Sequence, residues 1–242
     1  MRKLILFFIA VSLGLTMTSC LDEGSQNFSE SSIVYIAMDQ GLVYGKTLTG
    51  RVITSDKRDM MVPGTFKFLS YSWEESYGYT SLGEVSVYNV ITSGEVIDIS
   101  QTYLQMAPVT EVTPKLDFKD IKRPVYDENG IYLDDYWLFE YSYMGKEGET
   151  PIVSFYKRSS TEQNPDPVEI DVRLVKTGTP KDGASEKLYT DVIAVDMRQL
   201  RQMYGGTSTT STKDLRIKFW YYLDGRTELT ESQTYIMKVK GN

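Results

Sequence analysis

Apolar and polar residues alternate with a period of two over most of the chain from Ile33 onward, the pattern of β-strands with one buried face. The apolar positions are largely Val, Ile, Tyr and Phe, which favour strands. In the first half this pattern predicts strands at 33–38, 48–54, 65–71, 84–91 and 95–99. Turn-forming clusters separate these short segments, so we expect a small β-barrel or β-sandwich.

The second half predicts strands at 135–143, 152–157, 168–175, 190–196, 215–223 and 234–240. The clearest is 168–175, where Val168, Ile170, Val172 and Leu174 alternate with Glu169, Asp171 and Arg173. A strand with one buried face and one solvent-exposed face is typical of an antiparallel sheet packed on a partner sheet. Asp224-Gly225 predicts a type I′ hairpin, and only 197–204 has helical spacing.

Three prolines interrupt the pattern between residues 107 and 129, where charges are mixed and periodicity is weak. Proline lacks a ladder donor, so this stretch indicates a domain boundary. We therefore predict an all-β chain with an N-terminal domain at 33–115, a linker at 116–130 and a C-terminal antiparallel β-sandwich at 131–242.

The N-terminus has the layout of a bacterial lipoprotein signal peptide. Two basic residues, Arg2 and Lys3, precede an apolar run, and small residues lead into Cys20, the single cysteine. The alternative, a retained transmembrane helix, needs about 20 apolar residues, and this run has only about 12. We expect a signal peptide at 1–19, lipidation of Cys20, a flexible tether at 20–32 and membrane attachment through the lipid.

Two acidic residues, Asp22 and Glu23, closely follow Cys20. This placement resembles the surface-export signal of lipoproteins of the Bacteroidetes, which implies an outer-membrane protein displayed at the cell surface. An ordinary solvated linker is the alternative.

The composition excludes several function classes. The formal net charge is −7, which disfavours nucleic acid as a partner. The chain has no histidine, and no free thiol remains once Cys20 is lipidated, so Ser/His/Asp triads, Cys/His dyads and the common zinc sites are excluded. We expect no catalytic residues, no cofactor, no metal and no enzyme activity.

Aromatic clusters are the features most suggestive of a ligand. Trp73, Tyr77 and Tyr79 fall in a loop-flanked stretch, where exposed rings could stack on a sugar. The alternative is that they fill the core, which we favour for the aromatic residues of 136–143 and 219–222 because they alternate along strands.

Paired carboxylates invite two further hypotheses. Glu74-Glu75 and Asp134-Asp135 could suggest a glycosidase, but neighbours along a strand point to opposite faces, so exposed charges are the better interpretation. The segment 127–130 is similar to part of a calcium loop, but its ligand spacing is broken, which favours a tight turn.

The order of motifs resembles the NigD-like lipoproteins of the Bacteroidetes. The likeness is carried by Gly50-Arg51-Val52-Ile53, by the segments 134–143 and 191–196 with Leu200, and by 215–220 ahead of Asp224-Gly225. The resemblance implies an N-terminal OB-like barrel and a C-terminal β-sandwich, with no known catalytic residues. The family takes its name from a gene cluster linked to bacteriocin production.

Three functions follow as hypotheses. The first is a non-enzymatic interaction or assembly role for a lipid-anchored envelope protein. The second is glycan binding for a nutrient-uptake system. The third, from the resemblance alone, is a bacteriocin-associated or immunity-type role.

Overall fold

The computed structural model describes residues 27–55, 57, 61–110, 116–162, 165–208 and 210–241. The predicted signal peptide at 1–19 and the predicted lipidation site, Cys20, lie outside the described residues. The described chain folds into two compact units, which divide between Ser100 and Gln101. Within the described ranges, no helix has the length and apolar composition needed to cross a membrane.

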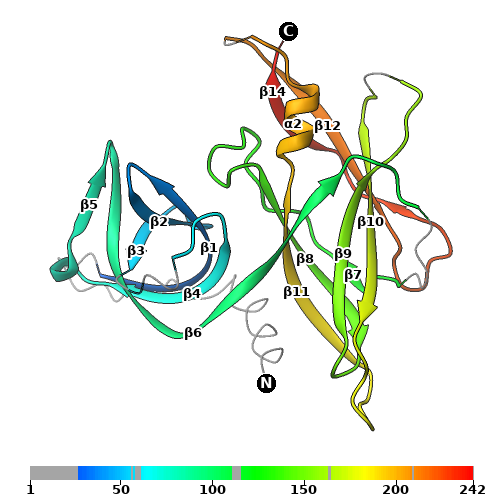
Figure 1. Ribbon diagram of the computed structural model, residues 1–242, viewed down its shortest axis with the longest axis horizontal. Helices are drawn as coiled ribbons and strands as arrows, with labels where there is room; N and C mark the ends of the chain where they lie inside the picture. The colour runs from blue at the N-terminus through cyan, green and yellow to red at the C-terminus, as the bar shows by residue number, and fades with distance from the viewer. Residues whose placement is uncertain are drawn as a thin grey trace. The chain divides into compact units, whose positions relative to one another are not determined.

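The unit before residue 101 is a closed five-stranded barrel with a projecting hairpin (Figure 1). Its elements are β1 (Phe28–Asp39), β2 (Leu42–Thr47), β3 (Val52–Ser55), β4 (Phe66–Trp73), the 3-10 turn η2 (Glu75–Tyr77), β5 (Tyr79–Leu82) and most of β6 (Val85–Gln105). Antiparallel pairs join β1 to β2, β2 to β3, β1 to β4 and β4 to β6, and the parallel pair β3–β6 closes the ring. The expected OB-like barrel is confirmed.

β1 begins inside the segment expected to be a flexible tether. Residues 28–32 pair with β4, and the ring of Phe28 stacks on that of Trp73 with centroids 5.4 Å apart. The prediction of a tether at 20–32 is therefore wrong for residues 28–32. The sequence did not predict this part of the strand because its residues are polar. Their side chains bond to neighbouring strands, and the hydroxyl oxygens of Ser31 and Ser70 lie 2.7 Å apart.

β6 is one long bent strand where the sequence predicted two, at 84–91 and 95–99. Its pairing with β4 shifts at a bulge: Phe68 lies opposite Ile97, but Ser70 lies opposite Ser93. Gly94, with φ of +72°, lies in the extra segment. Such a bulge bends the strand, which lets β6 follow the barrel wall instead of turning.

β2 is absent from the predicted strands, and the predicted strand 48–54 is reduced to β3 (Val52–Ser55). The intervening residues form a turn, in which the amide of Gly50 donates to the carbonyl of Thr47 at 3.1 Å. Gly45 in β2 also lacks a side chain for a packing reason, because a Cβ there would lie 2.3 Å from Cγ1 of Val34. A strand with glycine at its buried position gives only a weak alternation.

A polar cluster joins β1, β4 and the β2–β3 turn. The carboxylate of Glu30 accepts hydrogen bonds from Tyr71, Arg51 and, at 2.8 Å, Thr49. Arg51 also lies over the ring of Phe28, 4.3 Å from its centroid. Burial, together with the hydrogen bond to Glu30, raises the pKa of the fully buried Tyr71 hydroxyl far above its ordinary value, so this group remains a donor.

The unit from residue 101 onward is a two-sheet sandwich. Its elements are the end of β6, β7 (Asp120–Ile121), β8 (Tyr136–Gly145), β9 (Thr150–Lys157), β10 (Val168–Thr177), β11 (Lys187–Asp196), α2 (Arg198–Tyr204), β12 (Thr212–Tyr221), β13 (Thr230–Glu231) and β14 (Tyr235–Lys240). One sheet contains β7, β8 and β11, and the other contains β9, β10, β12, β13 and β14. The predicted all-β fold and sandwich are confirmed.

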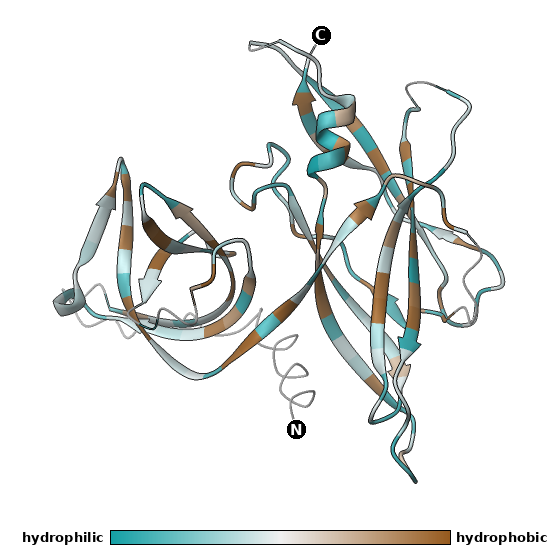
Figure 2. Ribbon diagram, in the orientation of Figure 1, coloured by the Kyte–Doolittle hydropathy of each residue, from teal (hydrophilic) through white to brown (hydrophobic). Residues whose placement is uncertain are grey.

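The sandwich core is aromatic, and apolar positions alternate along its strands (Figure 2). Phe139 of one sheet contacts Phe155 and Phe219 of the other, with ring centroids 5.1 and 4.9 Å away. The core interpretation is therefore confirmed for the alternating residues Trp137, Phe139, Tyr141, Tyr143 and Phe219, with Tyr221 partly buried against them. Trp220 and Tyr222 are only partly buried and do not belong to this cluster. In β10 the apolar face is buried as predicted, but Asp171 on the opposite face is also buried, where it accepts a bond from Arg173 at 2.8 Å.

The predicted linker at 116–130 is instead part of the sandwich. Phe118 is fully buried in its core, and isolated bridges join Leu116 to Leu174 and Val125 to Leu138. The boundary at residue 100–101 therefore precedes the one expected near 115. Isolated bridges and the two-residue strand β7 satisfy parts of this backbone without a long ladder, so the segment gives no strand periodicity.

The predicted helix is confirmed as α2, whose Leu200 and Tyr204 are buried. The predicted type I′ hairpin at Asp224-Gly225 is wrong. Only Gly225 has positive φ, and the next strand, β13, begins at Thr230. A turn does form there, with the amide of Arg226 donating to the carbonyl of Leu223 at 3.1 Å.

Replacing Tyr71 by Phe removes one donor from the Glu30 carboxylate. We expect a loss of about 1.5–3 kcal/mol in the free energy of unfolding of the barrel, because a bond to a charged group is lost. Urea denaturation measures it, with Tyr79→Phe as the control, since Tyr79 is 60% exposed. Equal stability of the two variants would contradict the proposed contribution of this cluster to the free energy of unfolding.

Candidate functional site

The barrel carries a pocket of about 740 Å³. Its walls come from the β1–β2 turn, β2, β3, the β3–β4 connection, η2 and β6: Gly41, Leu42, Val43, Thr54, Ser55, Met61, Tyr77, Asn89, Val90 and Ile91. OB-type barrels bind ligands on the face of strands 2 and 3 and at the loops beside it. The pocket therefore lies where this architecture places a binding site.

The parallel pairing of β3 with β6 builds one wall directly. Thr54 lies opposite Asn89, and Ser55 lies opposite Val90. The Thr54 hydroxyl donates to the carbonyl of Val43 at 3.0 Å, and the Asn89 amide donates to the carbonyl of Tyr77 at 3.0 Å. These donors are engaged within the barrel, so their bonds hold the wall in place.

The remaining surface of the pocket is mostly apolar. Leu42, Val43 and Tyr77 are half-buried, Met61 and Val90 are buried, and Ile91 is 50% exposed. Among the described residues that line it, none carries a charged side chain. Such a lining suits an apolar group, whose transfer from water contributes about 25 cal/mol for each Å² buried.

The structure separates the three aromatic residues that the sequence proposed for ligand binding. Trp73 is buried: its ring packs between Phe28 and Tyr88, and its indole N–H donates to the carbonyl of Gly78 at 2.8 Å. Trp73 is therefore a core residue, a correction to its placement in a sugar-stacking site. Tyr77 lines the pocket, whereas Tyr79 is exposed on β5 and is not among the lining residues.

The aliphatic residues of the pocket had no distinguishing signal in the sequence. Leu42 and Val43 belong to the strand that the pattern missed. Ile91 ends the predicted strand 84–91, whose apolar positions all resemble core positions, and lies within β6. Burial of one face of a strand and lining of a pocket require the same residue types, so of the residues proposed from the sequence only Tyr77 pointed to this region.

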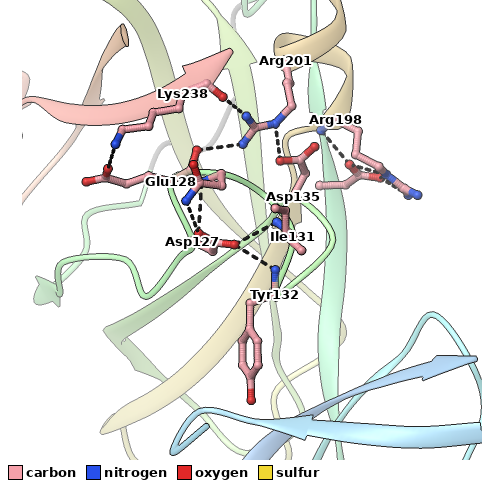
Figure 3. A network of polar contacts seen from close by, with 10 residues as sticks. Asp127, Glu128, Ile131, Tyr132, Asp135, Arg198, Arg201 and Lys238 are labelled. Atoms are coloured by element: carbon pink, nitrogen blue, oxygen red, sulfur yellow. Dashed lines mark hydrogen bonds and ion pairs between the residues drawn. The ribbon is translucent and has the colours of Figure 1, made fainter. Parts of the chain in front are cut away.

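The segment 127–130 forms the tight turn that the sequence favoured over a calcium loop (Figure 3). One carboxylate oxygen of Asp127 accepts from the amide of Asn129 at 3.0 Å, and the other accepts from those of Ile131 and Tyr132, both at 2.8 Å. Both oxygens are thus engaged by the backbone. No cluster suited to a metal ion occurs within the described ranges.

Arg201 of α2 ties this turn to β14 and to Asp135, the residue before β8 (Figure 3). Its guanidinium donates to the carboxylate of Asp135, to the carbonyl of Lys238 and, at 3.1 Å, to the carbonyl of Glu128. Burial raises the pKa of Asp135, and the attraction of Arg201 offsets only part of that rise. Asp134 in turn pairs with Arg198 at 3.5 Å, so the pair 134–135 is engaged by arginines rather than arranged as two catalytic acids.

The pKa of Asp127 predicts how the stability of the sandwich changes at acid pH. Burial alone would raise its pKa, but the backbone donors outweigh burial and lower it. Because the folded pKa lies below the unfolded one, its contribution is present above about pH 4 and is lost as pH falls through the folded value.

We expect Asp127→Asn to be less stable than wild type at neutral pH and to lose less stability on acidification. Denaturation between neutral and acid pH measures both. Asp182→Asn is the control, because Asp182 is exposed. Parallel pH profiles for wild type and Asp127→Asn would refute this assignment.

Solved structures share this fold at low sequence identity. An uncharacterized protein from Parabacteroides merdae ATCC 43184 aligns with a TM-score of 0.61 and 11% identity, over 87% of this chain and 98% of its own. A protein described as a "putative lipoprotein", from Bacteroides fragilis NCTC 9343, aligns with a TM-score of 0.58 and 11% identity, over 88% and 99%. A NigD-like immunity protein from Bacteroides caccae ATCC 43185 aligns with a TM-score of 0.48 and 14% identity, over 86% and 97%.

Searches of protein families and of curated proteins found no match. The first two structures carry the comparison, and at 11% identity they show the fold alone. A NigD-like protein, of the kind that the sequence resembles, is among the structural neighbours. The two-unit fold of this chain therefore occurs in proteins of the genera Parabacteroides and Bacteroides.

Proposed function

We propose that this chain is a lipid-anchored protein of the outer membrane, displayed at the cell surface, that acts by binding a partner protein rather than by catalysis. The observation that carries the binding role is the apolar pocket on the barrel. The anchor rests on the leader and Cys20, and a fold neighbour described as a "putative lipoprotein" is in line with it.

The distribution of charged groups supports binding over catalysis. Among the described residues, Asp134 and Asp135 are engaged by arginines, and Glu30 is held by its three donors. None of these groups lines the pocket, and among its described lining residues the polar side chains are the hydroxyls of Thr54, Ser55 and Tyr77 and the amide of Asn89, with no carboxylate or cationic group. General acid–base chemistry needs a titratable group within reach of the ligand.

The lining also favours a protein group over a sugar. Sugar sites combine an exposed aromatic face with several free hydrogen-bonding groups, whereas Trp73 is buried and the Asn89 amide already donates within the barrel. An aliphatic or aromatic side chain of a partner protein matches Leu42, Val43 and Ile91. Glycan binding and an immunity-type role remain the alternative hypotheses.

A photo-crosslinking amino acid in place of Ile91 tests the pocket in intact cells. We expect a discrete adduct with a partner protein, because half of the Ile91 side chain is accessible at the pocket. The control is the same substitution at Ile131, which is 76% exposed on the sandwich unit. In a second arm, Ile91→Asp should weaken association with the captured partner by at least about tenfold, because binding would bury an unpaired charge.

Two outcomes would count against a protein partner. Adducts of equal yield at positions 91 and 131 would show that the pocket is not the contact. A glycan array bound by the wild type but not by Ile91→Asp would favour the sugar-binding alternative.

Replacement of Cys20 by Ser tests the anchor. We expect the protein to move from the membrane fraction to the soluble fraction and to incorporate no labelled palmitate, because the lipidated thiol is lost. Protease treatment of intact cells then tests display: wild-type protein fully protected on whole cells would contradict exposure at the surface.

A further inference from the structure

The hairpin arm of the barrel consists of β5 and residues Val85–Tyr88 of β6, and β5 is an edge strand (Figure 1). In the described part of the chain β5 pairs with β6 alone, in the register Tyr79–Tyr88 to Leu82–Val85. The amide of Asn89 donates to the carbonyl of Gly78 at 3.2 Å, which fixes the phase of the ladder. Antiparallel pairing alternates, so the N–H and C=O groups of Tyr79 and Ser81 point away from β6.

This edge lacks most of the usual protection. Proteins commonly guard an edge strand with lysine, proline, a bulge or a covering segment, because its outward backbone groups can pair with another chain. β5 contains neither lysine nor proline, and Tyr79, Thr80 and Ser81 are all exposed. Among the described residues its short length is its one protection. This edge leaves two outward N–H donors and two outward C=O acceptors.

The charged residues next to β5 in the sequence have one sign. Glu74 and Glu75 precede the strand, Glu84 follows it, and all three are exposed. From residue 74 to residue 91 the chain has no lysine, arginine or histidine. Pairing of this edge with a second copy of the chain would bring like charges together, whereas a segment with lysine or arginine would be attracted.

We propose that the free edge of β5 is a strand-addition site for an extended, positively charged segment of a partner polypeptide. The backbone groups of Tyr79 and Ser81 supply the hydrogen bonds, and the three glutamates select the charge. Strand addition draws affinity from main-chain bonds and specificity from the side chains on either face. The site uses the outer edge of the hairpin and does not depend on the apolar pocket binding anything.

The probe is a short synthetic peptide of alternating valine and threonine with lysine at both ends, titrated calorimetrically into the detergent-solubilised full-length protein. We expect Ser81→Pro, which removes an outward N–H, to bind about tenfold more weakly than the matched Ser81→Ala. Hydrogen exchange should show new protection of the Tyr79 and Ser81 amides on binding.

Two further binding measurements test the proposal even if Ser81→Pro disturbs the fold. A peptide N-methylated at consecutive residues, which cannot donate along either edge, should bind wild type at least tenfold more weakly. Joint replacement Glu74→Gln, Glu75→Gln and Glu84→Gln should weaken binding and reduce its dependence on salt.

Other results would overturn the proposal. These are equal affinity of Ser81→Pro and Ser81→Ala, equal affinity of the N-methylated peptide, or equal affinity of a peptide with glutamate in place of lysine. Loss of binding in Ile91→Asp but not in Ser81→Pro would place the peptide in the pocket instead, which would overturn the edge site and leave the proposed binding function standing.

Discussion

The parallel pairing of β3 with β6 is the interaction on which the N-terminal unit depends. It closes the barrel, and the same register sets Thr54 beside Asn89 and Ser55 beside Val90, four of the residues that line the pocket. On its other edge β6 pairs with β4 and β5. Barrel closure, the pocket wall and the hairpin arm therefore arise from one strand, which is why the bulge at Gly94 that bends it matters.

Carboxylates in this acidic chain serve mainly to fix its architecture. Glu30 joins β1 to β4 and to the β2–β3 turn, Asp127 holds a turn through backbone amides, and Asp171 pairs with Arg173. A carboxylate removed from water costs free energy unless donors surround it, and each of these has such donors. These three acid groups, held by their donors, are poor candidates for proton transfer.

Sequence periodicity predicted the elements whose buried faces alternate without interruption, such as β10, and it predicted the helix α2. It failed where another interaction replaced apolar burial: serine and glutamate bonds in residues 28–32, and a close backbone approach at Gly45. The prediction failed for the segment 116–126 because its backbone uses isolated bridges and a strand of only two residues, β7. The pocket could not be predicted because its aliphatic residues match core residues. The prediction of Trp73 as a ligand-binding residue was wrong because exposure cannot be judged from a loop-flanked position alone.

The early start of β1 also changes what the proposed anchor implies. With β1 beginning at Phe28, only residues 21–27 separate Cys20 from the barrel. A fully extended chain covers at most about 3.6 Å per residue, so a lipidated Cys20 would hold the barrel within about 30 Å of the membrane surface. Confinement of this kind raises the effective concentration of any partner held in the same membrane. A short edge strand and a modest apolar pocket, each weak alone, can then support association with a membrane-bound partner without a large interface.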